Sequence, residues 1–137
     1  MEHQRGGAFL RRAAPFLSVA ALVAGSCLYL RRFERYAITG ASMEPALVEG
    51  DWAIIDRRAY RHQPPGAGDV VMVKDPRLPE RTLVKRAAGR DGASTRVIGD
   101  NAAQSTDSRV FGAVPDELLV GRVLWRYWPL RRFGRVA

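Results

Sequence analysis

The sequence contains few cysteines and histidines, and this shortage excludes several kinds of chemistry. Among 137 residues there is one cysteine, Cys27, so the chain forms neither an internal disulfide nor a cysteine-based zinc site. The two histidines are His3, in the N-terminal tail, and His62, which lies next to a proline-rich stretch. With so few soft ligands, we expect no metal centre.

The sequence also lacks any recognisable nucleic-acid-binding motif, although its formal net charge is +8. Its arginines are scattered along the chain rather than gathered on one predicted helix, which argues against DNA or RNA as a partner. A basic chain that carries an apolar segment is better explained by contact with anionic lipid, which attracts basic groups near its surface. We therefore expect membrane lipid as a partner and no nucleic acid.

One segment lacks charge altogether. Residues 13–30 carry no charged side chain, and arginine pairs at 11–12 and 31–32 flank them. As a helix this segment would be about 27 Å long at about 1.5 Å per residue, close to the roughly 30 Å hydrocarbon core of a bilayer. We predict a basic tail at 1–12, a single transmembrane helix at 13–30 and a folded domain at 31–137.

Two alternatives for this segment stay open: a cleaved signal peptide, and a lipoprotein signal that ends at Cys27. The orientation of a span is also open, because arginines flank both of its ends and the positive-inside rule does not discriminate between them.

Beyond residue 36 the pattern changes to short apolar runs separated by Gly, Pro, Asp and Asn. Runs of this length with β-branched residues are typical of strands. They lie at residues 52–55, 70–73, 82–84, 96–98 and 119–124. Turn signals occur at residues 66–69 and 90–92, and the second suits a tight hairpin. We predict a mainly β fold, a small folded sheet or barrel-like domain that follows one N-terminal helix.

Lysine is scarce as well, and this points to a candidate base. Of 22 basic residues only Lys74 and Lys85 are lysine, and arginine cannot act as a base because its pKa is too high. Lys85 lies in an apolar run, where burial would lower its pKa, whereas Lys74 is interpreted as a solvated partner of Asp75. The alternative is that Lys85 is a surface lysine on an edge strand. His62 has no obvious orienting acid nearby in the sequence.

A candidate nucleophile, Ser42, lies in a stretch of small residues between the apolar segment and the first predicted strand. Gly40, two residues upstream, allows another backbone to approach closely, as a peptide substrate must. The alternative is that Ser42 caps a helical turn with Pro45 early in it.

A third cluster, residues 99–109, is dense in hydroxyl and acidic side chains and follows a predicted strand. If residues 107–109 are extended, Asp107 and Arg109 lie on one face and can form an ion pair. A solvated turn would explain the cluster equally well.

Taken in order, the three clusters resemble the signal peptidase I family. Ser42-Met43-Glu44-Pro45 is similar to its Ser-Met-x-Pro box, and Thr82-Leu83-Val84-Lys85-Arg86 resembles the strand that carries its lysine. Residues 99–115 resemble its Gly-Asp-Asn and Ser-x-Asp-Ser-Arg box, with Asp100 in the first part.

The resemblance implies a role for each matching residue. Ser42 would be the nucleophile and Lys85 the general base, with the Ser105 hydroxyl orienting the lysine and Asp107 and Arg109 forming a structural ion pair. The backbone N–H of Ser42 would be one oxyanion donor. Gly40 stands where some members have a serine that supplies the second donor, so Thr39 or a backbone amide would have to replace it.

The implied function is a membrane-bound serine endopeptidase that removes signal or leader peptides from precursor proteins through an acyl-enzyme, without a cofactor. By resemblance its location would be the bacterial cytoplasmic membrane, with the catalytic domain on the outer face. One alternative is a protease dedicated to one propeptide, such as that of nickel superoxide dismutase. Another is an inactive, membrane-tethered β module that only binds peptides. The precursor substrates and the oligomeric state stay open.

Overall fold

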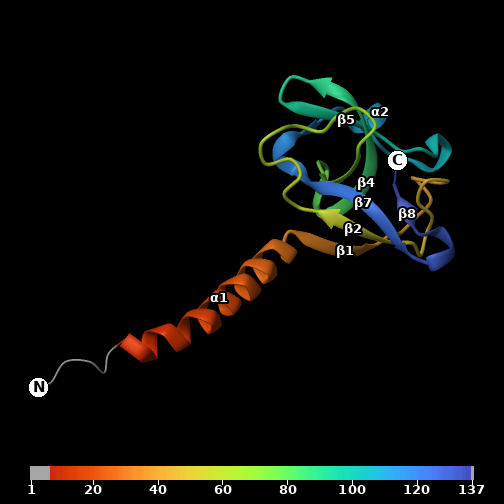
Figure 1. Ribbon diagram of the computed structural model, residues 1–137. Helices are drawn as coiled ribbons and strands as arrows, with labels where there is room; N and C mark the ends of the chain where they lie inside the picture. Colours follow the sequence, from red (N-terminus) through yellow and green to blue (C-terminus); the bar gives the residue numbers. More distant parts are fainter. Residues whose placement is uncertain (1–6, 137) are drawn as a thin grey trace, which may run out of the picture. The chain divides into compact units, whose positions relative to one another are not determined.

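The computed structural model describes residues 7–136, with side chains from residue 18 onward. The chain divides into two compact units with the boundary between Arg32 and Phe33. The first unit contains the helix α1 (Gly7–Leu30), coloured red to orange in Figure 1. The first six residues of the predicted tail lie outside the description.

The helix predicted at residues 13–30 is confirmed as part of α1, but its role as a membrane span is not. Within the described part of the chain, no helix combines the length and apolar character that crossing a membrane requires. The side chains of residues 13–17 lie outside the description.

The second unit is built on one antiparallel sheet, which confirms the mainly β prediction (Figure 1). The strand order is β1-β2-β7-β3-β4-β5-β6, and β8 also pairs with β7. The strands are β1 (Phe33–Ala37), β2 (Trp52–Asp56), β3 (Val70–Asp75), β4 (Leu78–Asp91), β5 (Ser94–Ile98), β6 (Val114–Pro115), β7 (Leu119–Trp128) and β8 (Gly134–Arg135).

The five predicted strands correspond to β2, β3, β4, β5 and β7, and the hairpin predicted at residues 90–92 joins β4 to β5. Gly92 has a φ of +58°, a left-handed conformation that glycine adopts without a steric penalty. The prediction missed β1, β6 and β8. Two adjacent charges interrupt the apolar pattern of β1, and β6 and β8 are two residues long, too short for a periodic signal.

The core lies on both faces of β3. Alternate side chains of a strand point to opposite faces. Val70 and Met72 belong to one buried cluster, together with Met43 and Leu47. Val71 and Val73 belong to a second cluster, together with Leu83, Ala87, Val97 and Val114. The sheet therefore folds over itself around β3, which is why this run is apolar at every position from 70 to 73.

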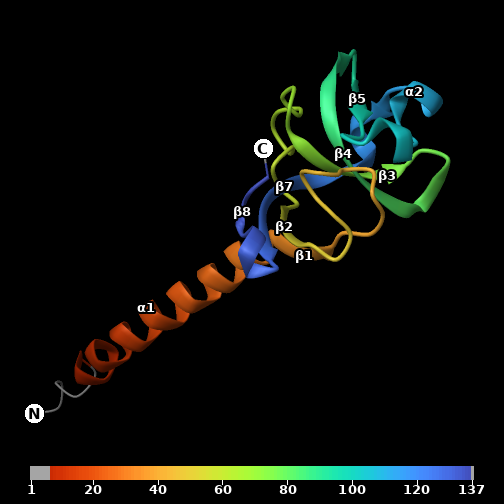
Figure 2. The ribbon, with the colours of Figure 1, turned by 90° about the vertical axis from the view of Figure 1, so that its right-hand side faces the viewer.

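Between β5 and β6 the chain forms a short 3₁₀ turn, η1 (Ala102–Gln104), and one turn of helix, α2 (Ser108–Phe111). Figure 2 shows α2 beside β5, where the Val97 N–H donates to Ser108 Oγ at 2.8 Å. Two further 3₁₀ turns, η2 (Asp116–Leu118) and η3 (Leu130–Arg132), flank β7.

Candidate active site

Ser42 lies in a loop between β1 and β2. Residues 42–46 form consecutive turns, and the Leu47 N–H donates to the Met43 carbonyl at 2.9 Å, as in one turn of helix. Across residues 18–136 the Ser42 hydroxyl accepts no hydrogen bond from a backbone N–H, so the alternative that Ser42 caps this turn is not supported. Met43, the next residue, is buried in the core, while Gly40, with a φ of +78°, is exposed. The Ser42 carbonyl accepts a hydrogen bond from the Asn101 N–H at 3.0 Å, which ties this loop to the segment after β5. Ser42 is thus fixed on one side and half-exposed on the other.

A buried carboxylate holds the far end of the same loop. Asp51 is 1% exposed and lies 3.3 Å from the Arg132 guanidinium and 3.9 Å from that of Arg126. Both arginines also donate to loop carbonyls, Arg126 to that of Ala46 at 2.6 Å and Arg132 to that of Pro45 at 3.0 Å. Arg126 of β7 and Arg132 of the η3 turn therefore fasten the loop to the sheet and to the segment that follows it.

Lys85 lies in the middle of β4 and is 3% exposed, which excludes the alternative of a surface lysine. Burial lowers the pKa of Lys85 below its ordinary value, as the sequence predicted, and the nearby charge of Asp107 acts in the opposite direction. Its neighbour Arg86 forms a two-contact ion pair with Asp100, at 2.7 Å for each contact, while Lys85 bonds to Ser105. The two cations thus have separate partners.

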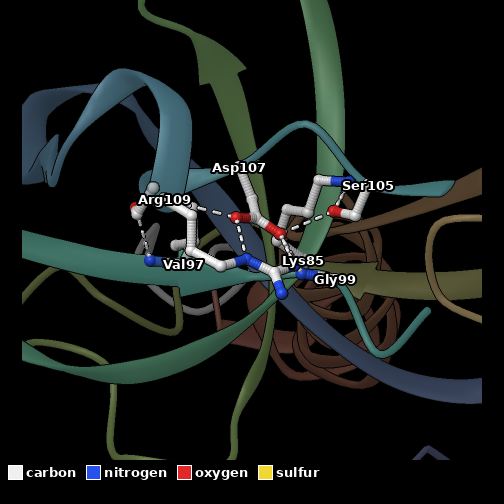
Figure 3. Close-up of polar contacts among 7 residues, drawn as sticks. Lys85, Val97, Gly99, Ser105, Asp107 and Arg109 are labelled. Carbon is white, nitrogen blue, oxygen red and sulfur yellow. Dashed lines mark hydrogen bonds and ion pairs between the residues drawn. The ribbon is translucent and has the colours of Figure 1, made fainter. Parts of the chain in front are cut away.

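Three of the predicted site residues form one hydrogen-bonded chain behind Lys85 (Figure 3). Lys85 Nζ donates to Ser105 Oγ at 3.1 Å, and Ser105 Oγ donates to Asp107 Oδ2 at 2.7 Å. Asp107 also accepts from the Gly99 N–H at 2.8 Å and from the Arg109 guanidinium at 2.5 and 2.8 Å. The carboxylate is fully buried, and these bonds, the Arg109 contacts foremost, hold its pKa far below the ordinary range.

Gly99, which directly follows β5, allows the Ser42 loop and Ser105 to approach the backbone closely. A Cβ atom on Gly99 would lie 2.2 Å from Ser105 Oγ and 2.6 Å from the Ser42 carbonyl oxygen. No side chain fits at such distances, so this close approach requires glycine. The Gly-Asp-Asn motif marked this glycine in the sequence, but the steric reason for a glycine at position 99 was not predicted.

A cavity of about 170 Å³ joins the predicted nucleophile and the predicted base. Its wall includes Ser42, Gly40 and Lys85, so the structure brings together residues that are up to 45 positions apart. Asp100 does not line it and instead pairs with Arg86. Two arginines that we did not predict, Arg77 and Arg81, line it as well. Strand alternation was a signal for Arg81, because residues 81, 83 and 85 share one face of a regular strand.

Ser42 and Lys85 are not hydrogen-bonded to each other in this structure. Across residues 18–136, the Ser42 hydroxyl forms no hydrogen bond with Lys85, whose Nζ donates to Ser105. The Ser42 backbone N–H likewise donates to no other group in the same range, so it is available to an incoming oxygen atom. A candidate nucleophile and a candidate base that line one cavity, with a free N–H beside the serine, are the groups that acyl transfer would need.

The structure corrects two local predictions. Asp75 pairs with Arg77 at 2.9 Å rather than with Lys74, which is exposed on β3. Asp107 and Arg109 do pair, but not because the segment is extended. Asp107 is instead the N-cap of α2, and its side chain accepts from the Arg109 N–H. The pairing therefore comes from a helix cap rather than from strand alternation.

Comparison with known proteins decides the family. A model of the family described as "Signal peptidase, peptidase S26" matches residues 10–97 and 94–128. The chain belongs to this family. The family consists of serine peptidases that remove leader peptides. The residues that its model matches lie in both units of this chain.

Similar proteins in this family include mitochondrial inner membrane protease subunits and a probable signal peptidase I. The mitochondrial ATP-independent inner membrane protease subunit 1b of Arabidopsis thaliana is 34% identical over 156 residues, covering 97% of this chain and 88% of its own. Subunit 1a from the same plant is 36% identical and covers 87% of each chain. The probable signal peptidase I-1 of Synechocystis is 26% identical and covers 94% of this chain and 88% of its own. These relatives do not support the predicted bacterial membrane over a mitochondrial one.

Proposed function

We propose that this chain is a serine endopeptidase that cleaves leader peptides from precursor proteins, with Ser42 as nucleophile and Lys85 as general base. The observation that carries the proposal is that Ser42 and the buried Lys85 line one cavity, with Ser105 bonded to the lysine. The burial that lowers the pKa of Lys85 makes its neutral form, the form that accepts a proton, accessible at lower pH.

The proposed reaction has two steps. In the first, Lys85 Nζ accepts the Ser42 hydroxyl proton as Ser42 Oγ bonds to the scissile carbonyl carbon, and the Ser42 N–H stabilises the charge on the carbonyl oxygen. The C–N bond then breaks, and the leaving amine takes the proton from Lys85. In the second step Lys85 accepts a proton from water as the water oxygen attacks the acyl ester carbon. The ester C–O bond then breaks, Ser42 Oγ takes the proton back from Lys85, and the product leaves as a carboxylic acid that ionises in solvent.

Ser105, Asp107 and Arg109 are positioning residues in this proposal. The Ser105 hydroxyl donates its hydrogen bond to Asp107. The lone pairs of the Ser105 oxygen therefore remain available to accept a hydrogen bond from Lys85 Nζ. Asp107 is held by Arg109 and by the Gly99 N–H, so the lysine amine has one fixed partner. Gly40 lines the same cavity as Ser42.

The substitution Ser42→Ala tests this proposal, because it removes only the attacking oxygen. We expect cleavage of an alanine-containing leader peptide by the full-length chain to fall by several orders of magnitude, with thermal unfolding unchanged. Retained cleavage by the folded variant would contradict the proposal. The same test separates an active peptidase from the inactive peptide-binding module.

We also propose that residues 13–30 anchor the chain in a membrane as a single span. The uncharged stretch and its flanking arginines support this, as do relatives named as inner membrane proteases. Extraction of membranes at alkaline pH tests the anchor. Recovery of the intact chain in the supernatant would contradict it.

A further inference from the structure

The wall of the Ser42 cavity is basic. Three of its lining residues are cationic types, namely Arg77, Arg81 and Lys85, and among the described residues none that line it is acidic. The reaction proposed above uses Lys85 alone, so the purpose of the two arginines is open.

Arg77 already has a partner for its charge. Its guanidinium donates to both oxygens of Asp75, at 3.1 and 2.9 Å, and the Asp75 carboxylate is buried. The same guanidinium lies 5.0 Å from the centre of the Phe111 ring. Arg77 is therefore held in place and largely neutralised by this ion pair.

Arg81 differs from Arg77 in each respect. It is exposed, and across residues 18–136 it forms no hydrogen bond or ion pair. Its charge nevertheless reaches the site. It adds to the burial that lowers the pKa of Lys85, and it opposes the burial that raises the pKa of Tyr36, another lining residue. The charge of Arg81 also contributes, after that of Arg77, to lowering the pKa of the buried Asp75 carboxylate, but Asp75 forms its ion pair with Arg77. Arg81 is therefore the exposed cation on the cavity wall that has no direct partner among residues 18–136.

We propose that Arg81 is a specificity-determining residue that favours precursor peptides with an aspartate or glutamate near the scissile bond. This inference rests on the proposed function of the cavity and deepens it. A peptide carboxylate would give Arg81 the partner that the protein does not provide, in a charge-assisted hydrogen bond. An exposed guanidinium loses little hydration before binding, so discrimination is modest.

A peptide series cleaved by the full-length chain tests this inference. The parent peptide has an uncharged, alanine-rich sequence around the cut, and each derivative carries one glutamate, glutamine or lysine at one position. We expect kcat/KM for glutamate to exceed that for glutamine by about fivefold at one or two positions, near the upper end for an exposed ion pair. Equal kcat/KM for the three residues at every position would overturn the proposal.

Charge reversal identifies the residue responsible. In Arg81→Glu the preferred residue at the same positions should change from glutamate to lysine, and in Arg81→Gln the ratio should fall to about one. Arg96→Gln is the matched control, since Arg96 is exposed on β5 and does not line the cavity, and the ratio should stay at about five. If Arg81→Glu still prefers glutamate, residues other than Arg81 discriminate between the peptides and the proposal is wrong.

A pH profile distinguishes a charge effect from a steric one. The charges that act on Lys85 are those of Asp107 and Asp75, which raise its pKa, and those of Arg81 and Arg109, which lower it. Arg81→Gln should therefore move the acid limb of kcat/KM for the uncharged peptide to higher pH. If the acid limb stays at the same pH in Arg81→Gln, the charge of Arg81 does not act on Lys85.

Binding separates this inference from the peptidase assignment. Fluorescently labelled glutamate and glutamine peptides are titrated into Ser42→Ala and into Ser42→Ala combined with Arg81→Glu. Tighter binding of the glutamate peptide by the first protein, lost in the second, supports the inference even if no peptide is cleaved. Equal binding of both peptides by the first protein would refute it, whether or not cleavage occurs.

Discussion

Asp107→Asn removes the buried charge behind the candidate base while preserving the shape of the side chain. In the structure both carboxylate oxygens accept from donors only. Oδ1 accepts from the Arg109 backbone N–H and from Nε, at 3.2 and 2.8 Å. Oδ2 accepts from the Gly99 N–H, the Ser105 hydroxyl and the other Arg109 nitrogen, at 2.8, 2.7 and 2.5 Å.

An amide group satisfies this environment poorly in either orientation. If its nitrogen occupies the Oδ1 position, two donors face an N–H group, and if it occupies the Oδ2 position, three donors do. Each unsatisfied buried group costs about 1–3 kcal/mol, but Arg109 is 46% exposed and can turn to water. We therefore expect Asp107→Asn to lower the free energy of unfolding by about 3 kcal/mol, the lower end for breaking a buried ion pair.

Urea unfolding of the full-length chain, followed by tryptophan fluorescence, measures this loss. The control is Asp91→Asn, which removes the same charge from an exposed position near the β4–β5 turn and should change stability by less than about 0.5 kcal/mol. If Asp107→Asn is as stable as the control, the buried ion pair does not stabilise the domain and the reasoning fails.

The pH dependence of the difference provides a second check. The pKa of Asp107 is lowered in the folded protein, so the stability from its charge is present above its unfolded pKa, about 3.9. This contribution is lost as the pH falls below that value and the carboxylate becomes protonated. The gap between wild type and Asp107→Asn should therefore be widest above about pH 5 and narrow in more acidic solution. A gap that widens on acidification would contradict this linkage.

Two further predictions concern the lysine and the glycine of the site. Because burial lowers the pKa of Lys85, kcat/KM should rise with pH and level off below the ordinary lysine value of 10.5, and Lys85→Arg should be as inactive as Lys85→Ala. Near wild-type turnover by Lys85→Arg would place the base elsewhere. Gly99→Ala should lower the free energy of unfolding by about 2 kcal/mol and impair cleavage, because its Cβ would meet Ser105 Oγ at 2.2 Å. Gly134→Ala, where a Cβ meets nothing within 4 Å, is the control, and equal stability of both variants would refute this steric argument.

Local sequence was sufficient for the elements that carry a periodic or motif signal. The apolar runs predicted five strands, and turn chemistry predicted the hairpin at residues 90–92, since both depend on neighbours along the chain. The burial of Lys85 could be predicted because it lies in an apolar run on a central strand. The error on Asp75 has the same origin, because adjacency in sequence suggested Lys74 whereas alternation turned the two side chains to opposite faces.

The sequence by itself determined the mainly β class, the family and the candidate pair Ser42 and Lys85, because each has a local pattern or a characteristic order of motifs. Tertiary structure alone decided the rest. Three features depend on segments that are distant in sequence and meet in the folded sheet: the ion pairs of Asp51 with Arg126 and Arg132, the close approach at Gly99, and the position of Arg81 on the cavity wall without a direct partner among residues 18–136. A linear pattern encodes the type of a side chain, but whether a charge is paired depends on which other segments pack against it.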